Sequence, residues 1–164
     1  MSAFNMLVVL GSTASGKTKL AVELAKMLNG EIISADSRQV YRGLDIGSGK
    51  DLDEYQEINH HLIDIVEPGY EYSIFDFQKD VISAYQDITD KNKLAIMAGG
   101  SALYVDSILK GYRLVEVPEN IVLRASLSTL SHETLVSKLL ALKPNLHNTT
   151  DIIERERLVR AIEI

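Results

Sequence analysis

The sequence predicts an α/β fold in which helices flank a parallel sheet, with a helical appendage in the last third of the chain. Apolar runs typical of strands alternate with segments of helical periodicity, and this alternation indicates a parallel sheet. A glycine-rich loop joins the first strand to the first helix. No strand pattern follows Met97, where the remaining periodicity is helical.

The first half of the chain is expected to begin with a strand over Met6–Leu10 and a helix over Lys17–Leu28. Asn29-Gly30 ends this helix, because both residue types accept the left-handed conformation found at helix C-termini. Glu31–Ala35 is predicted to be a short second strand. Residues 36–72 then form a long connection, and such a connection inside a compact domain is more often functional than idle.

A second helix is predicted to begin at Ser73, because Ser73 and Asp76 have the spacing of a capping box. Leu94–Met97 is the third buried strand, and Gly99-Gly100 leads into a helix that reaches Leu109. Ligands of parallel sheets bind beyond the carboxyl ends of the strands. The segments that follow the three strands are therefore expected to meet at one cleft.

The last third of the chain is predicted to form three helices, over Pro118–Leu130, Ser131–Leu142 and Asp151–Glu163. Turns are predicted at Pro144-Asn145 and Asn148-Thr149. The expected organisation is an α/β core over residues 1–115 and a helical appendage over residues 116–164.

A phosphate-binding motif fills the loop after the first strand. Its residues are Gly11, Ser12, Thr13, Ala14, Ser15, Gly16, Lys17 and Thr18. This is G-x-x-x-x-G-K-T, the P-loop of nucleotide-binding proteins, and it makes the predicted fold P-loop NTPase-like. The glycines let backbone N–H groups point at anionic oxygens, Lys17 supplies a positive charge, and the Thr18 hydroxyl can bind Mg²⁺. A glycine-rich turn that binds nothing is the alternative, which the flanking strand and helix disfavour.

Asp36 follows the second strand, and the residues alone leave its role open. It could hold Mg²⁺ through water, act as a general base, or start a turn together with Ser37. Gln39 has the paired donor and acceptor needed to read the edge of a base. Because Gly11–Thr18, Asp36 and Gly99-Gly100 all follow strands, we expect them to converge.

Other polar residues also have competing interpretations. His60 and His61 are adjacent, with no third ligand at a suitable spacing, so hydrogen bonding is expected in place of metal binding. Lys50 is either a second cation for phosphate or a solvated surface lysine. The predicted last helix mixes arginines with glutamates, which is typical of a solvated face. The residues concerned are Glu154, Arg155, Glu156, Arg157 and Arg160.

Composition excludes several classes of protein. The net charge of −6 argues against broad nonspecific affinity for nucleic acid. The absence of cysteine excludes disulfides and thiolate metal sites. No apolar stretch approaches the roughly 20 residues that span a bilayer, and the first residues lack a basic signal region, so a cytoplasmic protein without membrane contact is expected.

Seven motifs follow one another along the chain. They are Gly11–Thr18, Asp36-Ser37-x-Gln39-x-Tyr41, Ile46-Gly47-x-x-Lys50, His60-His61-Leu62-Ile63-Asp64, Tyr72-Ser73 with Phe77, Gly99-Gly100-x-x-Leu103-Tyr104 and Arg157-x-x-Arg160-Ala161-x-Glu163. In these motifs and in their order, the chain resembles one family, the tRNA dimethylallyltransferases, also called tRNA isopentenyltransferases.

The resemblance implies transfer of a dimethylallyl group from dimethylallyl diphosphate to N6 of adenosine 37, beside the tRNA anticodon. The P-loop would hold the diphosphate with Mg²⁺, Lys17 and Thr18 would assist catalysis, and Asp36 would accept a proton or hydrogen bond from N6. The adenosine must be flipped out of its stack. The tRNA contacts implied by the resemblance are Asp36, Ser37, Arg38, Gln39, Ser101, Arg124, Arg157 and Arg160.

The chain departs from the family's pattern at a few positions. Ser12 replaces the usual proline, Ser48-Gly49 stands where the family has Thr-Ala, and Ser101-Ala102 where it has Thr-Gly. Family members are usually longer, and beyond the region of Ile164 they return to the core and supply an arginine for the diphosphate. We therefore expect a fragment or a short form with reduced activity, exposed apolar surface and a tendency to form homo-oligomers.

Three alternatives remain open. An adenine-nucleotide isopentenyltransferase shares the P-loop but should not need the helical appendage. A small-molecule P-loop kinase would need a lid with phosphate-facing arginines, and none is evident between Lys50 and Met97. A truncated paralogue could bind diphosphate or RNA without turnover, although the intact Lys17, Thr18 and Asp36 oppose this.

Overall fold

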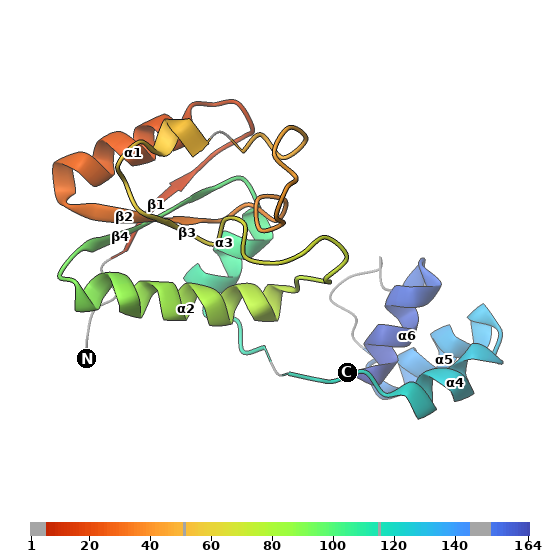
Figure 1. Cartoon of the computed structure of the whole chain (residues 1–164). Coiled ribbons are helices and arrows are strands. Elements are labelled where there is room, and N and C mark those ends of the chain that lie inside the picture. Colours follow the sequence, from red (N-terminus) through yellow and green to blue (C-terminus); the bar gives the residue numbers. More distant parts are fainter. Residues whose placement is uncertain (1–5, 51, 115, 145–151) are drawn as a thin grey trace. The chain divides into compact units, whose positions relative to one another are not determined.

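The computed structural model describes residues 6–50, 52–114, 116–144 and 152–164. The chain divides into two compact units, Met1–Leu114 and Val115–Ile164, which are described separately (Figure 1). The predicted turns at Pro144-Asn145 and Asn148-Thr149 lie wholly or partly outside the described residues.

The first unit is built on a four-stranded parallel sheet, which confirms the predicted fold class. Its strands are β1 (Met6–Leu10), β2 (Gly30–Ser34), β3 (His60–His61) and β4 (Leu94–Gly99), arranged in the order β1-β4-β2-β3. Val9 pairs with Ala98, and Ile33 with Met97. The central position of β4 brings the ends of β1 and β2 to either side of its own end.

Helices cover both faces of this sheet (Figure 1). The helix α1 (Lys17–Leu28) and the 3-10 helix η1 (Leu52–Tyr55) pack on one face, while α2 (Ile74–Asp90) and α3 (Ala102–Leu109) pack on the other. Neighbouring strand residues point to opposite faces, so Ile32 joins the first layer and Ile33 the second. Both are fully buried, as a parallel sheet covered on two sides requires.

Local signals set the helix ends as predicted. Asn29, with φ of 51°, takes the left-handed conformation that ends α1. Ser73 begins α2 with a complete capping box, because its side chain accepts from the backbone of Asp76 while the Asp76 side chain accepts from the backbone of Ser73. Gly30 already belongs to β2, so the second strand begins one residue earlier than predicted.

The strand β3 was not predicted. Its two residues, His60 and His61, pair with Ile32 and Ile33 on the outer side of β2. Two histidines form no apolar run that would predict a strand. They take strand conformation because they pair with β2. The predicted connection over residues 36–72 is correct in extent but includes this strand and η1.

The second unit contains three described helices, α4 (Ile121–Ser128), α5 (His132–Leu142) and α6 (Arg155–Glu163), as predicted. The helix α4 begins later than expected because Asn120 is its N-cap, accepting from the backbone N–H of Leu123 at 2.9 Å. Leucines from the three helices form a small core, with Leu127, Leu135 and Leu158 at most 1% exposed. Among the described residues, no helix is both long and apolar enough to cross a membrane.

Candidate active site

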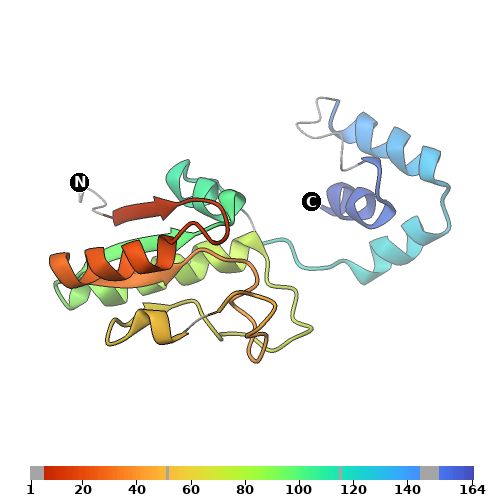
Figure 2. The same ribbon diagram turned by 90° about the horizontal axis from the view of Figure 1, so that it is seen from above.

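The P-loop lies between β1 and α1, in the strand-then-helix setting that the motif predicts (Figure 2). Gly16 stands at the N-cap of α1 with φ of 81°, a conformation that glycine adopts without strain. No side chain caps this end of α1. The first backbone N–H groups of the helix are therefore available to an anion, and the positive end of the helix dipole adds to their attraction.

Lys17 folds back across the loop and donates to the carbonyl oxygen of Ser12. A Cβ atom added to Gly100 would lie 4.0 Å from the Lys17 amine and 3.5 Å from the Gly11 carbonyl oxygen. The segment after β4 therefore runs directly beside the P-loop. A phosphate group entering the loop can take the Lys17 ammonium from Ser12, because a charged acceptor makes the stronger bond.

Asp36 follows β2 at the same edge of the sheet. Its Oδ1 accepts from the backbone N–H of Arg38 at 2.9 Å, so it does start a turn. Its Oδ2 accepts no hydrogen bond from any residue that the structure describes, and the side chain is half-buried. One oxygen thus orients the carboxylate, and the other remains for a ligand or a proton.

A serine pair joins the ends of β2 and β4. Ser37 donates its backbone N–H to Ser101 Oγ at 2.9 Å, and Ser101 donates its own backbone N–H to the Ala35 carbonyl oxygen at 3.1 Å. A Cβ at Gly99 would lie 2.1 Å from the same Ala35 oxygen, so only glycine permits this approach. The expected convergence of the three segments is confirmed.

Gln39 lies half-buried behind this pair. Its Oε1 accepts from the Ser34 hydroxyl at 3.0 Å, and its Nε2 faces the Gly49 carbonyl oxygen at 3.5 Å. Arg38, by contrast, is exposed. The structure therefore places Asp36, Ser37, Arg38 and Gln39 together beside the P-loop.

Sequence reasoning missed Tyr55. This residue is 5% exposed in η1, and its ring packs on that of His60 with centroids 4.6 Å apart. Burial, together with the charges of Glu54 and Asp36, raises the pKa of Tyr55 to about 12, although a hydrogen bond with the Thr18 side chain acts the other way. The phenol therefore stays neutral and lies near Thr18, the predicted Mg²⁺ ligand, a placement that no sequence motif predicts.

His61 and Lys50 turn out to have structural partners. His61 Nε2 lies 2.8 Å from Glu31 Oε2, which confirms hydrogen bonding for this histidine. Both interpretations of Lys50 are wrong, because its buried ammonium group contacts Asp45 and Asp64 and is neither solvated nor free for phosphate. No cluster of three or more His, Cys, Asp or Glu side chains suited to a metal occurs among the described residues.

Mg²⁺ nevertheless fits the donors at the P-loop. Thr18 offers a hydroxyl oxygen and Asp36 a carboxylate oxygen, which are the hard ligands that Mg²⁺ prefers. Mg²⁺ usually keeps several waters and takes its other ligands from substrate phosphates, so a site with few protein ligands is suited to it.

In the helical unit, ion pairs already engage two of the predicted tRNA-binding arginines. Arg124 meets the buried Glu163 with two hydrogen bonds of 3.1 and 2.9 Å, and Arg160 Nη1 lies 2.5 Å from the same carboxylate. Hydrogen bonds to its carboxylate, those from Arg124 above all, lower the pKa of Glu163 to about 2. Arg157 pairs with Glu154 and with no other acidic side chain among the described residues, and at 53% exposure it is the freest of the three to meet a phosphate.

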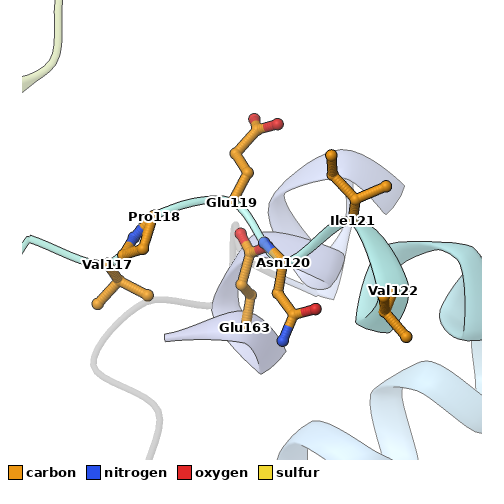
Figure 3. A pocket seen from close by; sticks show the side chains of 7 residues that line it. All are labelled: Val117, Pro118, Glu119, Asn120, Ile121, Val122 and Glu163. Atoms are coloured by element: carbon orange, nitrogen blue, oxygen red, sulfur yellow. The ribbon is translucent and has the colours of Figure 1, made fainter.

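The expected solvated face is confirmed, because Glu154, Arg155, Glu156 and Arg157 are all exposed. Arg155 nevertheless has partners within this unit. The Arg155 guanidinium donates to the carbonyl oxygens of Leu127, Ser128 and Leu130 at 3.2, 3.0 and 2.9 Å, which closes the C-terminus of α4. A shallow hollow of about 490 Å³ lies elsewhere in this unit (Figure 3). It is lined by Val117, Pro118, Glu119, Asn120, Ile121, Val122 and Glu163.

The fold and the motif define a P-loop α/β protein with a helical unit after the core. Comparison with known proteins narrows this class. The model of the IPP transferase family matches residues 39–164. The chain is 60% identical over 161 residues to tRNA dimethylallyltransferase 1 of Geotalea daltonii, covering 98% of this chain and 52% of the relative. It is 55% identical to tRNA dimethylallyltransferase 2 of Shewanella sediminis, covering 100% of this chain and 54% of the relative.

Solved structures agree. The full-length tRNA isopentenylpyrophosphate transferase of Bacillus halodurans matches with a TM-score of 0.67 and 35% identity, over 98% of this chain and 55% of the other. A eukaryotic dimethylallyltransferase acting on tRNA matches with a TM-score of 0.82 and 26% identity, over 98% and 41%. The chain belongs to the IPP transferase family, and it spans about half the length of the curated relatives it matches.

Proposed function

We propose that this chain takes part in the transfer of a dimethylallyl group from dimethylallyl diphosphate to the N6 atom of an adenosine beside the anticodon of tRNA. The observation that carries the proposal is the meeting of three segments at one edge of the sheet. The P-loop, Asp36 and the Ser37–Ser101 pair come together there, so a phosphate site adjoins a carboxylate and hydrogen-bonding groups.

The P-loop would bind the donor's diphosphate. Backbone N–H groups at the start of α1 and the Lys17 ammonium stabilise the negative charge that grows on the leaving oxygen as the allylic C–O bond breaks. Mg²⁺ held near Thr18 and Asp36 would supply further positive charge to the same diphosphate. The Tyr55 phenol, which lies close enough to Thr18 to affect its own pKa, would help to hold that hydroxyl in place.

Asp36 would act on the acceptor. As the N6 atom forms its bond to the allylic carbon, it must lose a proton, and Asp36 Oδ2 is the oxygen able to take it. The bond from the Arg38 N–H to Oδ1 orients the carboxylate for this transfer. The substrate base has to leave its stack to reach this edge of the sheet.

A free adenine nucleotide is the second candidate acceptor, because the site described so far needs only the base. The helical unit favours RNA, since Arg157 there is half-exposed and suited to a backbone phosphate. We propose a cytoplasmic location for this activity. A protein that binds diphosphate or RNA without turnover is the third candidate.

One assay separates these candidates. The purified chain is incubated with radiolabelled dimethylallyl diphosphate, Mg²⁺, and either an anticodon stem-loop carrying the acceptor adenosine or free AMP. We expect label in the stem-loop and little in AMP, and loss of transfer on addition of EDTA. Transfer to AMP alone would replace tRNA with the nucleotide as acceptor, and diphosphate binding without transfer to either would leave a binding protein.

A further inference from the structure

The ammonium group of Lys50 is buried at the centre of the connection between β2 and β3. It donates to the Tyr41 carbonyl oxygen at 2.9 Å, to Asp45 Oδ1 at 3.0 Å and to Asp64 Oδ1 at 2.5 Å. Its side chain is 0% exposed. An ammonium group has three protons, so these three acceptors use all of them. Lys50 therefore acts on its surroundings within the protein and not on a phosphate.

The partners of Lys50 surround Gln39. Asp64, which accepts from Lys50, donates its backbone N–H to the Gln39 carbonyl oxygen at 3.0 Å. The carbonyl oxygen of Gly49, the residue before Lys50, accepts a hydrogen bond from the Gln39 side-chain Nε2 at 3.5 Å. The anchored lysine thus fixes both the backbone and the side-chain neighbours of Gln39.

These contacts allow the Gln39 amide only one orientation. A carbonyl oxygen can only accept, so the nitrogen faces Gly49 and the oxygen faces the Ser34 hydroxyl, which donates at 3.0 Å from a residue that is 1% exposed. The amide keeps one N–H and one lone pair for a ligand. Adenine offers a matching donor and acceptor side by side, at N6 and N7 or at N6 and N1.

We propose that Lys50 is a positioning residue for the acceptor base: by anchoring Gly49 and Asp64 it holds the Gln39 amide in the orientation that selects adenine. This inference rests on the proposed function, because it says how that reaction chooses its acceptor. Lys50 itself touches neither substrate.

The test compares acceptor stem-loops that carry adenosine, 7-deazaadenosine or 1-deazaadenosine at the modified position. In the wild type, loss of the ring nitrogen that Gln39 reads should raise the KM for RNA roughly fivefold to tenfold, the worth of one such hydrogen bond. Lys50→Met should raise the KM for adenosine RNA and abolish this discrimination, while kcat at saturating RNA changes little. The exposed Lys79 of α2 provides the matched control, and Lys79→Met should leave both values unchanged.

A second variant covers the case in which Lys50→Met does not fold. Asp45→Asn weakens one contact of Lys50 at a side chain that is 63% exposed, and it should reduce the discrimination partly. Pyrophosphate affinity, measured by calorimetry, should be unchanged in both variants, which separates mispositioning of Gln39 from general loss of structure.

The effect of Lys50 on the position of Gln39 can also be measured by NMR, without the transfer reaction. The Gln39 side-chain amide signals, assigned by their loss in Gln39→Glu, should shift in Asp45→Asn and in folded Lys50→Met. Unchanged signals, or a wild type that accepts both deaza bases equally well, would overturn the proposal. If the wild type transfers nothing to any RNA, the proposed function fails, and the amide signals still decide whether Lys50 positions Gln39.

Discussion

Replacement of Glu31 by glutamine is expected to destabilise the first unit strongly. Glu31 lies at the start of β2, fully buried, and its carboxylate accepts from four side chains. The donors are Asn59 at 3.1 Å, His61 at 2.8 Å, Lys91 at 3.2 Å and Lys93 at 2.9 Å. These bonds tie β2 to β3 and to the turn between α2 and β4.

The magnitude follows from the environment of each group. Breaking a fully buried ion pair costs about 3–5 kcal/mol, because the remaining charge loses its partner. Here the side chains of Lys91 and Lys93 are 49% and 31% exposed and can turn towards water. We therefore expect Glu31→Gln to lower the free energy of unfolding by roughly 2–4 kcal/mol, after discounting the pair energy for that exposure.

The effect should also depend on pH. Burial opposes ionisation of Glu31, but its hydrogen bonds, that from Lys93 above all, hold its pKa well below the ordinary value of 4.5. A depressed pKa in the folded state stabilises the protein above the unfolded pKa, and this stabilisation is lost as the pH falls below it. The difference between wild type and Glu31→Gln should be complete at neutral pH and shrink below about pH 4.5.

Urea unfolding followed by circular dichroism at pH 7 and at pH 4 measures both effects. Glu23→Gln, at an exposed position of α1, is the matched control and should change stability by less than about 0.5 kcal/mol. The reasoning is refuted if Glu31→Gln unfolds within that same margin of the wild type, or if its deficit grows as the pH falls.

Four further variants test the site. Lys17→Ala and Thr18→Ala should each weaken Mg²⁺-dependent pyrophosphate binding by about 1.5–3 kcal/mol, the worth of a charge-assisted bond, without loss of fold; calorimetry beside circular dichroism measures this, and unchanged affinity in both would remove the phosphate site. Asp36→Asn should lower the transfer rate by about 10²–10⁴ while donor affinity barely moves, the usual effect of removing a general base; full turnover in single-turnover assays would reduce Asp36 to a turn residue. Gly99→Ala should disrupt the packing of β4 on Ala35, because the new Cβ would lie 2.1 Å from a carbonyl oxygen; an unchanged melting temperature would show that the backbone yields freely there.

The sequence alone determined the elements that local chemistry specifies. The strand, P-loop and helix at Met6–Leu28 follow from an apolar run, fixed glycines and helical periodicity, and all three occur where predicted. Ser73 and Asp76 predicted the start of α2, because all the residues of a capping box lie within four positions of the sequence. The convergence of P-loop, Asp36 and Gly99-Gly100 was also predictable, since parallel strands end at one edge.

Only the tertiary structure decided what the charged residues do. Lys50 and Glu31 each look like surface residues in the sequence, yet both are buried and bind partners as far as 14 and 62 residues away along the chain. Arg155 is exposed, but its guanidinium still reaches the carbonyl oxygen of Leu130, 25 residues away. Tyr55 reaches Thr18 in the same way, across a connection that has no periodicity. The physical reason is that a buried charge or phenol is tolerated only where the fold supplies its partners, and such partners come from distant segments that no local pattern connects.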